Sequence, residues 1–292
     1  MFSGSYVALV TPFKNGKIDE KKLKNLVHFH IEQGTSGLVP CGTTGESSTL
    51  LHSEREKVID IVVKEAGGSI PVIAGTGFNS TEETIEMSRF AKKAGAHSLL
   101  LVVPYYNKPT PEGLYQHFSH VAAAVDLPVI LYNIPGRTGV NLLPETVIRL
   151  AQDNKNIVGI KEASGNMDQA SEIIRTLGEN FCLLSGDDSL TLPLLAIGGK
   201  GVISVAANLI PRDVKEMVEC WNKGDISRAR ELHLRMFKLI KALFIETNPI
   251  PVKTAMGMLN MCLPDLRLPL LPMSEEHTKK LRETLKDYGL NI

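Results

Sequence analysis

The feature that most constrains the fold is a repeat in which short apolar runs alternate with longer amphipathic segments. Because parallel strands need long crossovers, usually helices, this alternation predicts an α/β fold with a parallel sheet. The starts of the runs are roughly 20 to 35 residues apart, about the length of one strand plus one helix. Eight such runs occur: Tyr6–Val10, Gly37–Cys41, Val72–Gly75, Ser98–Val103, Val129–Tyr132, Ile157–Lys161, Cys182–Ser185 and Gly201–Ser204.

Helix signals separate these runs. Ser80 and Glu83 have the spacing of a capping box and Gly95 follows the last turn, while Pro111 and Pro144 suit the first turn of a helix. Eight strand-helix units are the number that closes a (β/α)8 TIM barrel of about 250 residues, which is the fold we predict. A doubly wound sheet is the alternative, although no G-x-G-x-x-G follows the first run.

The last part of the chain has a different pattern. After Ser204 no run is typical of a strand, and from Pro211 onward the sequence is helical. We therefore expect a catalytic barrel over residues 1–225 and a C-terminal helical extension over residues 226–292. No Ser/Gly/Pro-rich linker separates the two, so the extension is interpreted as an appended layer.

Composition narrows the class of partner. Thirty-two basic residues balance thirty-two acidic ones, which disfavours nucleic acid or an anionic membrane as a partner. There is no basic leader and no run of roughly 18 apolar residues. Cys41, Cys182, Cys220 and Cys262 lack zinc-ligand spacing and are expected to be buried thiols. These observations predict a soluble cytoplasmic protein that acts on small molecules, without a metal.

Lys161 ends an apolar strand, where an ammonium is costly to desolvate. Burial favours the neutral, nucleophilic amine. Tyr132 ends the preceding strand, about 4.8 Å away in a parallel sheet, and could shuttle protons. Two alternatives stay open: Lys161 pairs with Asp187 or Asp188, and Tyr132 is a rim aromatic.

Two further loops carry candidate anion-binding groups. The segment GTTGES, residues 42–47, offers backbone N–H groups and hydroxyls that suit a carboxylate, and it lacks the lysine of a P-loop. Its alternative is a plain glycine turn before a helix. Arg137, in the loop after Tyr132, could bind a second carboxylate, or could be a solvated surface charge.

These motifs, in this order, resemble the pyruvate-dependent class I aldolase and lyase superfamily, and most closely its dihydrodipicolinate synthase family. The resemblance covers essentially the whole chain and rests on GSYVALVTPF, CGTTGES, VIAGTG, PYYNKP, LYNIPGRTG, GIKEASGN, LSGDDS, GVISVAAN and NPIPVK. It implies condensation of pyruvate with L-aspartate 4-semialdehyde to 4-hydroxy-tetrahydrodipicolinate, in lysine and diaminopimelate biosynthesis. It implies no cofactor.

The resemblance also assigns catalytic roles. Lys161 would form an imine with pyruvate, and Tyr132 would relay protons with Thr43 and Tyr106. In the family, the tyrosine at the last of these positions reaches in from a neighbouring subunit. A homodimeric unit, usually within a tetramer, is therefore implied.

Binding roles follow in the same way. Thr44 would hold the pyruvate carboxylate, and the carbonyl positions of Gly186 and Ile203 would line the pocket. Arg137 would grip the carboxylate of the semialdehyde.

Some members are inhibited by lysine at a cleft between subunits. One well-known type of feedback-sensitive relative has histidine where this chain has Arg55. A cation there would repel the lysine ammonium, so we expect no strong inhibition. The matching positions are Ser48, His52, Arg55, Asn79, Glu83 and Tyr105.

Two other functions are weighed against the synthase. A sialic acid lyase or a 2-keto-3-deoxy sugar acid aldolase would use the same lysine and tyrosine, but relatives of this kind generally lack an arginine at the position of Arg137. A non-catalytic keto-acid binding protein would need no nucleophile with a proton shuttle.

Overall fold

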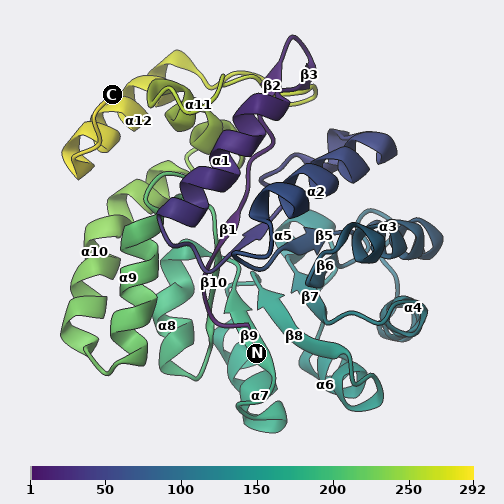
Figure 1. The fold of residues 1–292 in the computed structure, drawn as a ribbon. Helices are drawn as coiled ribbons and strands as arrows, with labels where there is room; N and C mark the ends of the chain where they lie inside the picture. Colours follow the sequence, from purple (N-terminus) through teal and green to yellow (C-terminus); the bar gives the residue numbers. More distant parts are fainter. Residues whose placement is uncertain (1) are drawn as a thin grey trace.

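The strands close into a barrel. The computed structural model describes residues 2–292, and Figure 1 shows a ring of strands surrounded by helices. The eight parallel strands lie in the order β4-β1-β10-β9-β8-β7-β6-β5. A parallel bridge between Leu38 and Val72 brings the two end strands, β4 and β5, together. The predicted (β/α)8 barrel is therefore confirmed, and the doubly wound alternative is wrong.

Each predicted run coincides with one strand, with ends that differ by at most two residues. The strands are β1 (Gly4–Ala8), β4 (Gly37–Val39), β5 (Ile73–Gly75), β6 (Ser98–Val102), β7 (Val129–Asn133), β8 (Ile157–Glu162), β9 (Cys182–Ser185) and β10 (Gly201–Ser204). The first run is displaced because Leu9 and Val10 stay buried after β1 has ended. An apolar run therefore reports burial more directly than it reports strand pairing.

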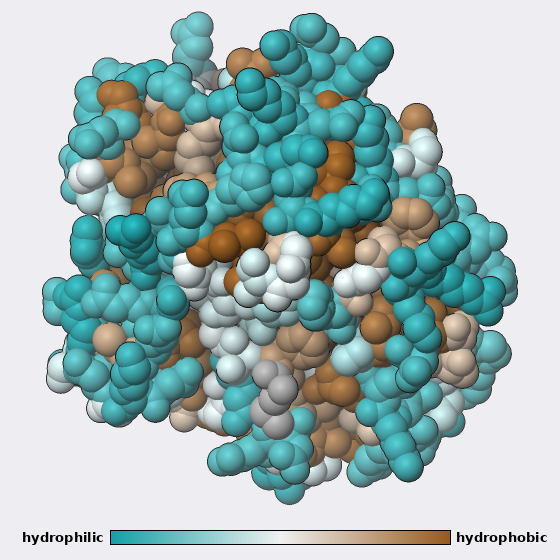
Figure 2. Space-filling view, in the orientation of Figure 1, coloured by the Kyte–Doolittle hydropathy of each residue, from teal (hydrophilic) through white to brown (hydrophobic). Residues whose placement is uncertain are grey.

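The helix boundary signals read from the sequence are confirmed for three of the helices around the barrel. The Ser80 side chain accepts a hydrogen bond from the Glu83 N–H, Gly95 ends the same helix with φ of 96°, and Pro111 and Pro144 occupy first turns. The surrounding helices are α1 (Glu20–Glu32), α2 (His52–Ala66), α3 (Thr81–Ala94), α4 (Pro111–Ala124), α6 (Pro144–Asp153), α7 (Met167–Leu177), α8 (Thr191–Ala196) and α9 (Pro211–Asn222). Between the hydrophilic faces of this ring, hydrophobic side chains are visible in Figure 2.

Several short elements were not predicted. Strands β2 (Phe13–Lys14) and β3 (Lys17–Ile18) form a hairpin whose turn, Asn15 and Gly16, has positive φ at both residues. An Asn-Gly pair suits such a turn because both residues tolerate positive φ. The other short elements are α5 (Pro135–Thr138), η1 (Ser47–Thr49), η2 (Asp188–Leu190), η3 (Ala206–Asn208) and α11 (Ile250–Met258).

The C-terminal segment packs against the side of the barrel. Helix α10 (Ile226–Ala242) lies against α9, and α12 (Glu275–Tyr288) lies against α10 and α11. The connection between α11 and α12 reaches the hairpin, where Arg267 Nη2 donates to the Gly16 carbonyl at 2.9 Å (Figure 1). We propose residue 225 as the end of the barrel domain, because the Asp225 side chain caps α10. Among residues 2–292, no helix is long and apolar enough to cross a membrane.

Alternation along the strands positions the site. Along β7, Ile130 and Tyr132 face the barrel interior, whereas Leu131 packs in the layer between strands and helices. Interior residues from other strands, including Leu184 and Ile203, complete the filling of the barrel. Tyr132 therefore lies at the carboxyl end of β7, at the end of the packed barrel interior where the strand leads into its loop.

Candidate active site

Lys161 and Tyr132 are direct neighbours. They are register partners on β8 and β7, and both side chains are buried, with 5% and 4% exposure. The Lys161 Nζ atom lies 4.1 Å from the centroid of the Tyr132 ring. The strand ends thus bring a buried amine and a phenol side by side.

Neither aspartate pairs with Lys161. Asp188 is buried and accepts hydrogen bonds from the Ser204 hydroxyl and from the N–H groups of Val205 and Ala206. Asp187 accepts from the Ser189 N–H at 2.8 Å. Within residues 2–292, Lys161 forms no ion pair with any carboxylate. The amine is therefore not neutralised by an acidic neighbour.

Gly186 makes room for the lysine. A Cβ atom at this position would lie 3.1 Å from Lys161 Cε and 2.6 Å from Ala163 Cβ. Ile203, on β10, is 1% exposed and belongs to the same barrel interior as Tyr132. A side chain larger than hydrogen at residue 186 would therefore crowd the stem that carries the amine.

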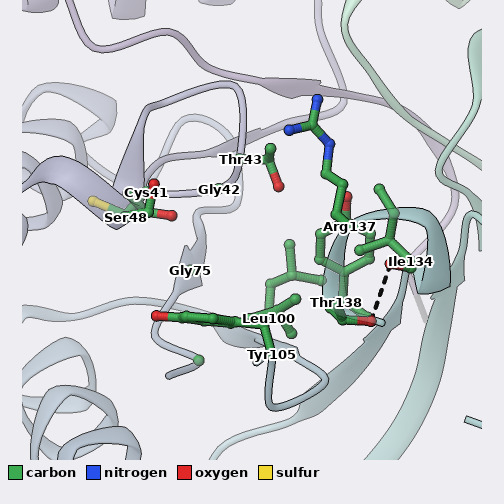
Figure 3. Close-up of a pocket in the computed structure, with 14 residues that line it drawn as sticks. Cys41, Gly42, Thr43, Ser48, Gly75, Leu100, Tyr105, Ile134, Arg137 and Thr138 are labelled. Carbon is green, nitrogen blue, oxygen red and sulfur yellow. Dashed lines mark hydrogen bonds between the residues drawn. The ribbon is translucent and has the colours of Figure 1, made fainter. Parts of the chain in front are cut away.

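A cavity of about 210 Å³ is lined in part by Tyr132, and Figure 3 shows the residues around it. Tyr132 lines it, whereas Lys161, Thr44, Gly186 and Ile203 are not among its lining residues. Tyr132 is thus the link between the cavity and the amine. The lining residues are Cys41, Gly42, Thr43, Ser47, Ser48, Gly75, Gly77, Leu100, Val102, Tyr105, Tyr132, Ile134, Arg137 and Thr138.

The GTTGES loop follows β4, and residues of the C-terminal segment contact it. Thr43 is half-buried on the cavity wall, and Thr44 is 2% exposed. Glu46 has a left-handed backbone, with φ of 54°, and its buried carboxylate lies 2.7 Å from Lys253 Nζ. The loop is therefore more than a plain turn before a helix, since its acidic residue is paired inside the protein.

Arg137 and Thr44 both contact Asn248. Arg137 lies on α5 and donates from Nη2 to the Asn248 carbonyl at 2.9 Å. Asn248 Nδ2 donates to Thr44 Oγ1 at 3.0 Å. Sequence reasoning missed Asn248, although it begins the NPIPVK motif. The only hint in the sequence is that Asn248 is a polar residue just before an apolar segment. No local pattern links it to a loop 204 residues away.

Tyr106 stands apart from the site of its own chain. It is 89% exposed, has a φ of 73°, and does not line the cavity. Left-handed backbone is unusual for a bulky residue. The adjacent Tyr105 instead turns toward the cavity wall.

The residues of the expected lysine site cluster around Arg55. Arg55 is 2% exposed, donates from Nε to the Ser47 carbonyl at 2.9 Å, and stacks 3.8 Å from the Phe78 ring centroid. His52 stacks on the same ring at 5.6 Å. Burial lowers the pKa of Arg55. It nevertheless remains a cation, because a guanidinium is effectively always protonated in proteins.

The other members of this set lie at its border. Ser48 is exposed and lines the cavity. The Asn79 carbonyl accepts from Asn107 Nδ2 at 2.8 Å, and Glu83 is exposed in the first turn of α3. The cavity thus extends from Tyr132 to the edge of the expected regulatory site.

The cysteine thiols are free. Burial raises the pKa of the Cys41 thiol to about 12, so this cavity-lining group stays protonated and is a poor nucleophile. Cys182 and Cys262 are also buried, as expected, whereas Cys220 is only half-buried because it lies near the end of α9. In the part of the chain that the structure describes, no three His, Cys, Asp or Glu side chains form a group that could hold a metal ion.

Comparison with known proteins agrees with this geometry. The sequence profile of the Dihydrodipicolinate synthetase family matches residues 1–288. The chain belongs to this family. One dihydrodipicolinate synthase relative, the 4-hydroxy-tetrahydrodipicolinate synthase of Geotalea uraniireducens (strain Rf4), is 57% identical over 290 residues, which cover 99% of this chain and 100% of the relative. The resemblance inferred from the motifs is therefore confirmed.

Solved structures of the dihydrodipicolinate synthase family superimpose closely. The crystal structure of the enzyme from Aquifex aeolicus has a TM-score of 0.98 and 56% identity, with 99% of each chain covered. A structure described as the first monomeric dihydrodipicolinate synthase variant has a TM-score of 0.97 and 46% identity, covering 99% of this chain and 98% of that one. Solved structures with this fold thus include one described as a monomeric variant.

Proposed function

We propose that this protein condenses pyruvate with L-aspartate 4-semialdehyde to 4-hydroxy-tetrahydrodipicolinate, in lysine and diaminopimelate biosynthesis. The observation that carries the proposal is the buried amine of Lys161, unpaired with any described carboxylate and 4.1 Å from the Tyr132 ring. The full-length relative that carries the name of this synthase supports the choice of substrates.

The proposed reaction begins at Lys161. Its neutral amine attacks C2 of pyruvate, and the carbinolamine loses water to give an imine. Loss of a proton from C3 gives an enamine, which forms a carbon–carbon bond to the aldehyde carbon of the semialdehyde. Hydrolysis releases the lysine and leaves an open-chain amino keto acid. Its amino group condenses with the keto carbon that was C2 of pyruvate and expels one water, which closes the ring of 4-hydroxy-tetrahydrodipicolinate. Tyr132, with Thr43, moves the protons that these steps require.

Two carboxylates need partners in this scheme. Thr44 binds that of pyruvate, in a pocket completed by Gly186 and Ile203. Arg137 binds that of the semialdehyde. The position of Arg137 on the cavity wall supports this assignment and favours the synthase over an aldolase for polyhydroxylated sugar acids.

The fourth catalytic group, Tyr106, comes from a second copy of the chain, within a dimer or a tetramer of two dimers. Its 89% exposure and its absence from its own cavity support this proposal. Mixing Tyr106→Phe with Lys161→Ala tests it, because a mixed dimer carries one complete site. Random exchange should restore activity to about a quarter of the sites. Two inactive variants that stay inactive after subunit exchange would contradict it.

The site around Arg55 binds lysine weakly in this proposal, because the guanidinium repels the lysine ammonium. Initial rates with increasing lysine test this, and half-inhibition at submillimolar lysine would refute it. The proposed compartment is the cytoplasm, where the four free cysteines would stay reduced.

Borohydride trapping tests the proposed function directly. Reduction in the presence of pyruvate should add one pyruvate-derived mass to the protein, on the peptide that contains Lys161, and Lys161→Ala should show none. A folded wild-type protein without this adduct would favour the non-catalytic binding function. Consumption of pyruvate with aspartate semialdehyde, and no cleavage of N-acetylneuraminate, separates the synthase from the sugar acid aldolases.

A further inference from the structure

Asn248 connects the two groups to which substrate carboxylates are assigned. It precedes α11, far along the chain from either loop, and is 5% exposed. Its side chain contacts Thr44, and its backbone carbonyl contacts Arg137. Residue 248 is therefore placed to influence both carboxylate-binding groups.

The polarity of the hydrogen bond to Thr44 gives an answer. Asn248 Nδ2 donates to Thr44 Oγ1 at 3.0 Å, which occupies one lone pair of the hydroxyl. A hydroxyl has a single hydrogen. Because Asn248 does not accept this hydrogen, the hydroxyl hydrogen of Thr44 can be donated to another group. The amide thereby fixes the Thr44 hydroxyl as a donor.

The other polar atom of the Asn248 side chain, Oδ1, indicates that this amide does more than stabilise the fold. Within residues 2–292, the buried Oδ1 atom of Asn248 has no hydrogen-bond partner. A buried polar atom without a partner costs free energy, so an amide retained only to stabilise the fold would be expected to satisfy both of its ends. The bond to Thr44 is the only one that this side chain makes in the described chain.

We propose that Asn248 is a positioning residue for pyruvate: it orients the Thr44 hydroxyl so that the hydrogen points at the substrate carboxylate. This inference rests on the proposed function. Arg137 is held by the backbone carbonyl of Asn248, and that contact does not depend on the identity of the side chain. The two substrates should therefore respond differently to a change at residue 248.

Two variants separate the possibilities. Asn248→Ala removes the donor, and we expect the KM for pyruvate to rise about tenfold, with the KM for aspartate semialdehyde within about twofold of wild type. Asn248→Asp keeps the shape but can only accept a hydrogen bond when ionised, so the Thr44 hydroxyl turns toward it. Its negative charge also lies beside the carboxylate site. The pyruvate KM should therefore rise more in Asn248→Asp than in Asn248→Ala.

A third background tests whether Asn248 acts through Thr44. In Thr44→Val, which has no hydroxyl, adding Asn248→Ala should change the pyruvate KM by less than about twofold. The thermal midpoint of each variant is measured in parallel. Equal increases in both KM values that follow a fall in the midpoint would overturn the inference, as would an unchanged pyruvate KM in Asn248→Asp.

The pyruvate dependence of borohydride trapping distinguishes this inference from the proposed function. If wild type and both Asn248 variants trap pyruvate with the same concentration dependence, the inference fails and the proposed function stands. If wild type traps no pyruvate at all, both fail. The expected result is trapping by all three proteins, with half-saturation shifted to higher pyruvate in the variants.

Discussion

Lys253 and Glu46 form an ion pair that is sealed from solvent, with Nζ 2.7 Å from Oε1 and side-chain exposures of 0% and 1%. Each group makes one further hydrogen bond: Lys253 Nζ donates to the Thr11 carbonyl at 3.0 Å, and Glu46 Oε2 accepts from the Arg267 N–H at 3.0 Å. Burial lowers the pKa of Lys253, and the Glu46 carboxylate opposes that shift. The pair ties α11 to the loop that carries Thr43 and Thr44.

Removing one partner of this pair should destabilise the protein strongly. Lys253→Met leaves the Glu46 carboxylate buried without a cation, and we expect the free energy of unfolding to fall by about 3–5 kcal/mol. Urea unfolding measures the change. Lys253→Met combined with Glu46→Gln should recover part of the loss, because no unpaired charge remains. A loss below about 1 kcal/mol in Lys253→Met would contradict this account.

Crowding at Gly186 should slow imine formation. In Gly186→Ala the new methyl group would press on the Lys161 stem, and we expect trapping of pyruvate to slow by about 10- to 100-fold, as small misplacements of reacting groups do. The rate of adduct formation under borohydride measures this. Gly136→Ala is the matched control, because a Cβ there meets nothing within 4 Å. Equal rates in the two variants would show that the methyl group is accommodated.

Loss of the Arg137 guanidinium should affect only the second substrate. Arg137→Ala is expected to raise the KM for aspartate semialdehyde about tenfold or more, while pyruvate trapping keeps its wild-type concentration dependence. Steady-state kinetics with each substrate varied in turn measures the split. Arg175→Ala, which removes an exposed arginine paired with Glu172, controls for the change in net charge. A pyruvate KM that rises equally would argue against the assignment.

Two buried histidines should make stability depend on pH. Burial lowers the pKa of His30 to about 3 and that of His117 to about 4, from an ordinary value of 6.5. Below pH 6.5 the unfolded chain gains protons that the folded protein does not, so stability falls with decreasing pH. The slope is about 1.4 kcal/mol per pH unit for each histidine, down to its folded pKa.

Denaturant unfolding between pH 7 and pH 4.5 checks this dependence. His117→Gln should reduce the slope of the free energy of unfolding against pH by the contribution of one histidine, about 1.4 kcal/mol per pH unit. Gln can keep a bond to Thr81, whose hydroxyl lies 2.9 Å from His117 Nδ1. A slope unchanged by the substitution would assign the acid sensitivity to other groups.

The barrel and the pair formed by Lys161 and Tyr132 could be predicted because the sequence patterns that indicate them are local. Each strand is an apolar run with helix caps around it, and the ends of sequential parallel strands must be neighbours. The position of Tyr132 beside Lys161 follows from those two facts. Gly186 was assigned to the pocket by the family resemblance alone, and its closeness to the lysine stem is visible only in the structure.

Contacts between distant segments could not be predicted in this way. Asn248 and Lys253 lie more than 200 residues from the loop that they hold, and α11 has prolines and apolar residues on every side that hide its helical period. Tyr106 is highly exposed and has a left-handed backbone, which a bulky residue type disfavours and which sequence alone does not predict. These contacts and this backbone conformation depend on how the whole chain packs, and the spacing of residues along the sequence does not predict them.

The anchoring of the GTTGES loop by Asn248, Lys253 and Arg267 has a consequence for biosynthesis of the protein. A ribosome delivers the eight strands before any of these three anchors. A nascent chain that stops before residue 248 has every strand of the ring yet lacks the partners of Thr44 and Glu46. The ring of strands can therefore emerge before the residues that hold the GTTGES loop in place.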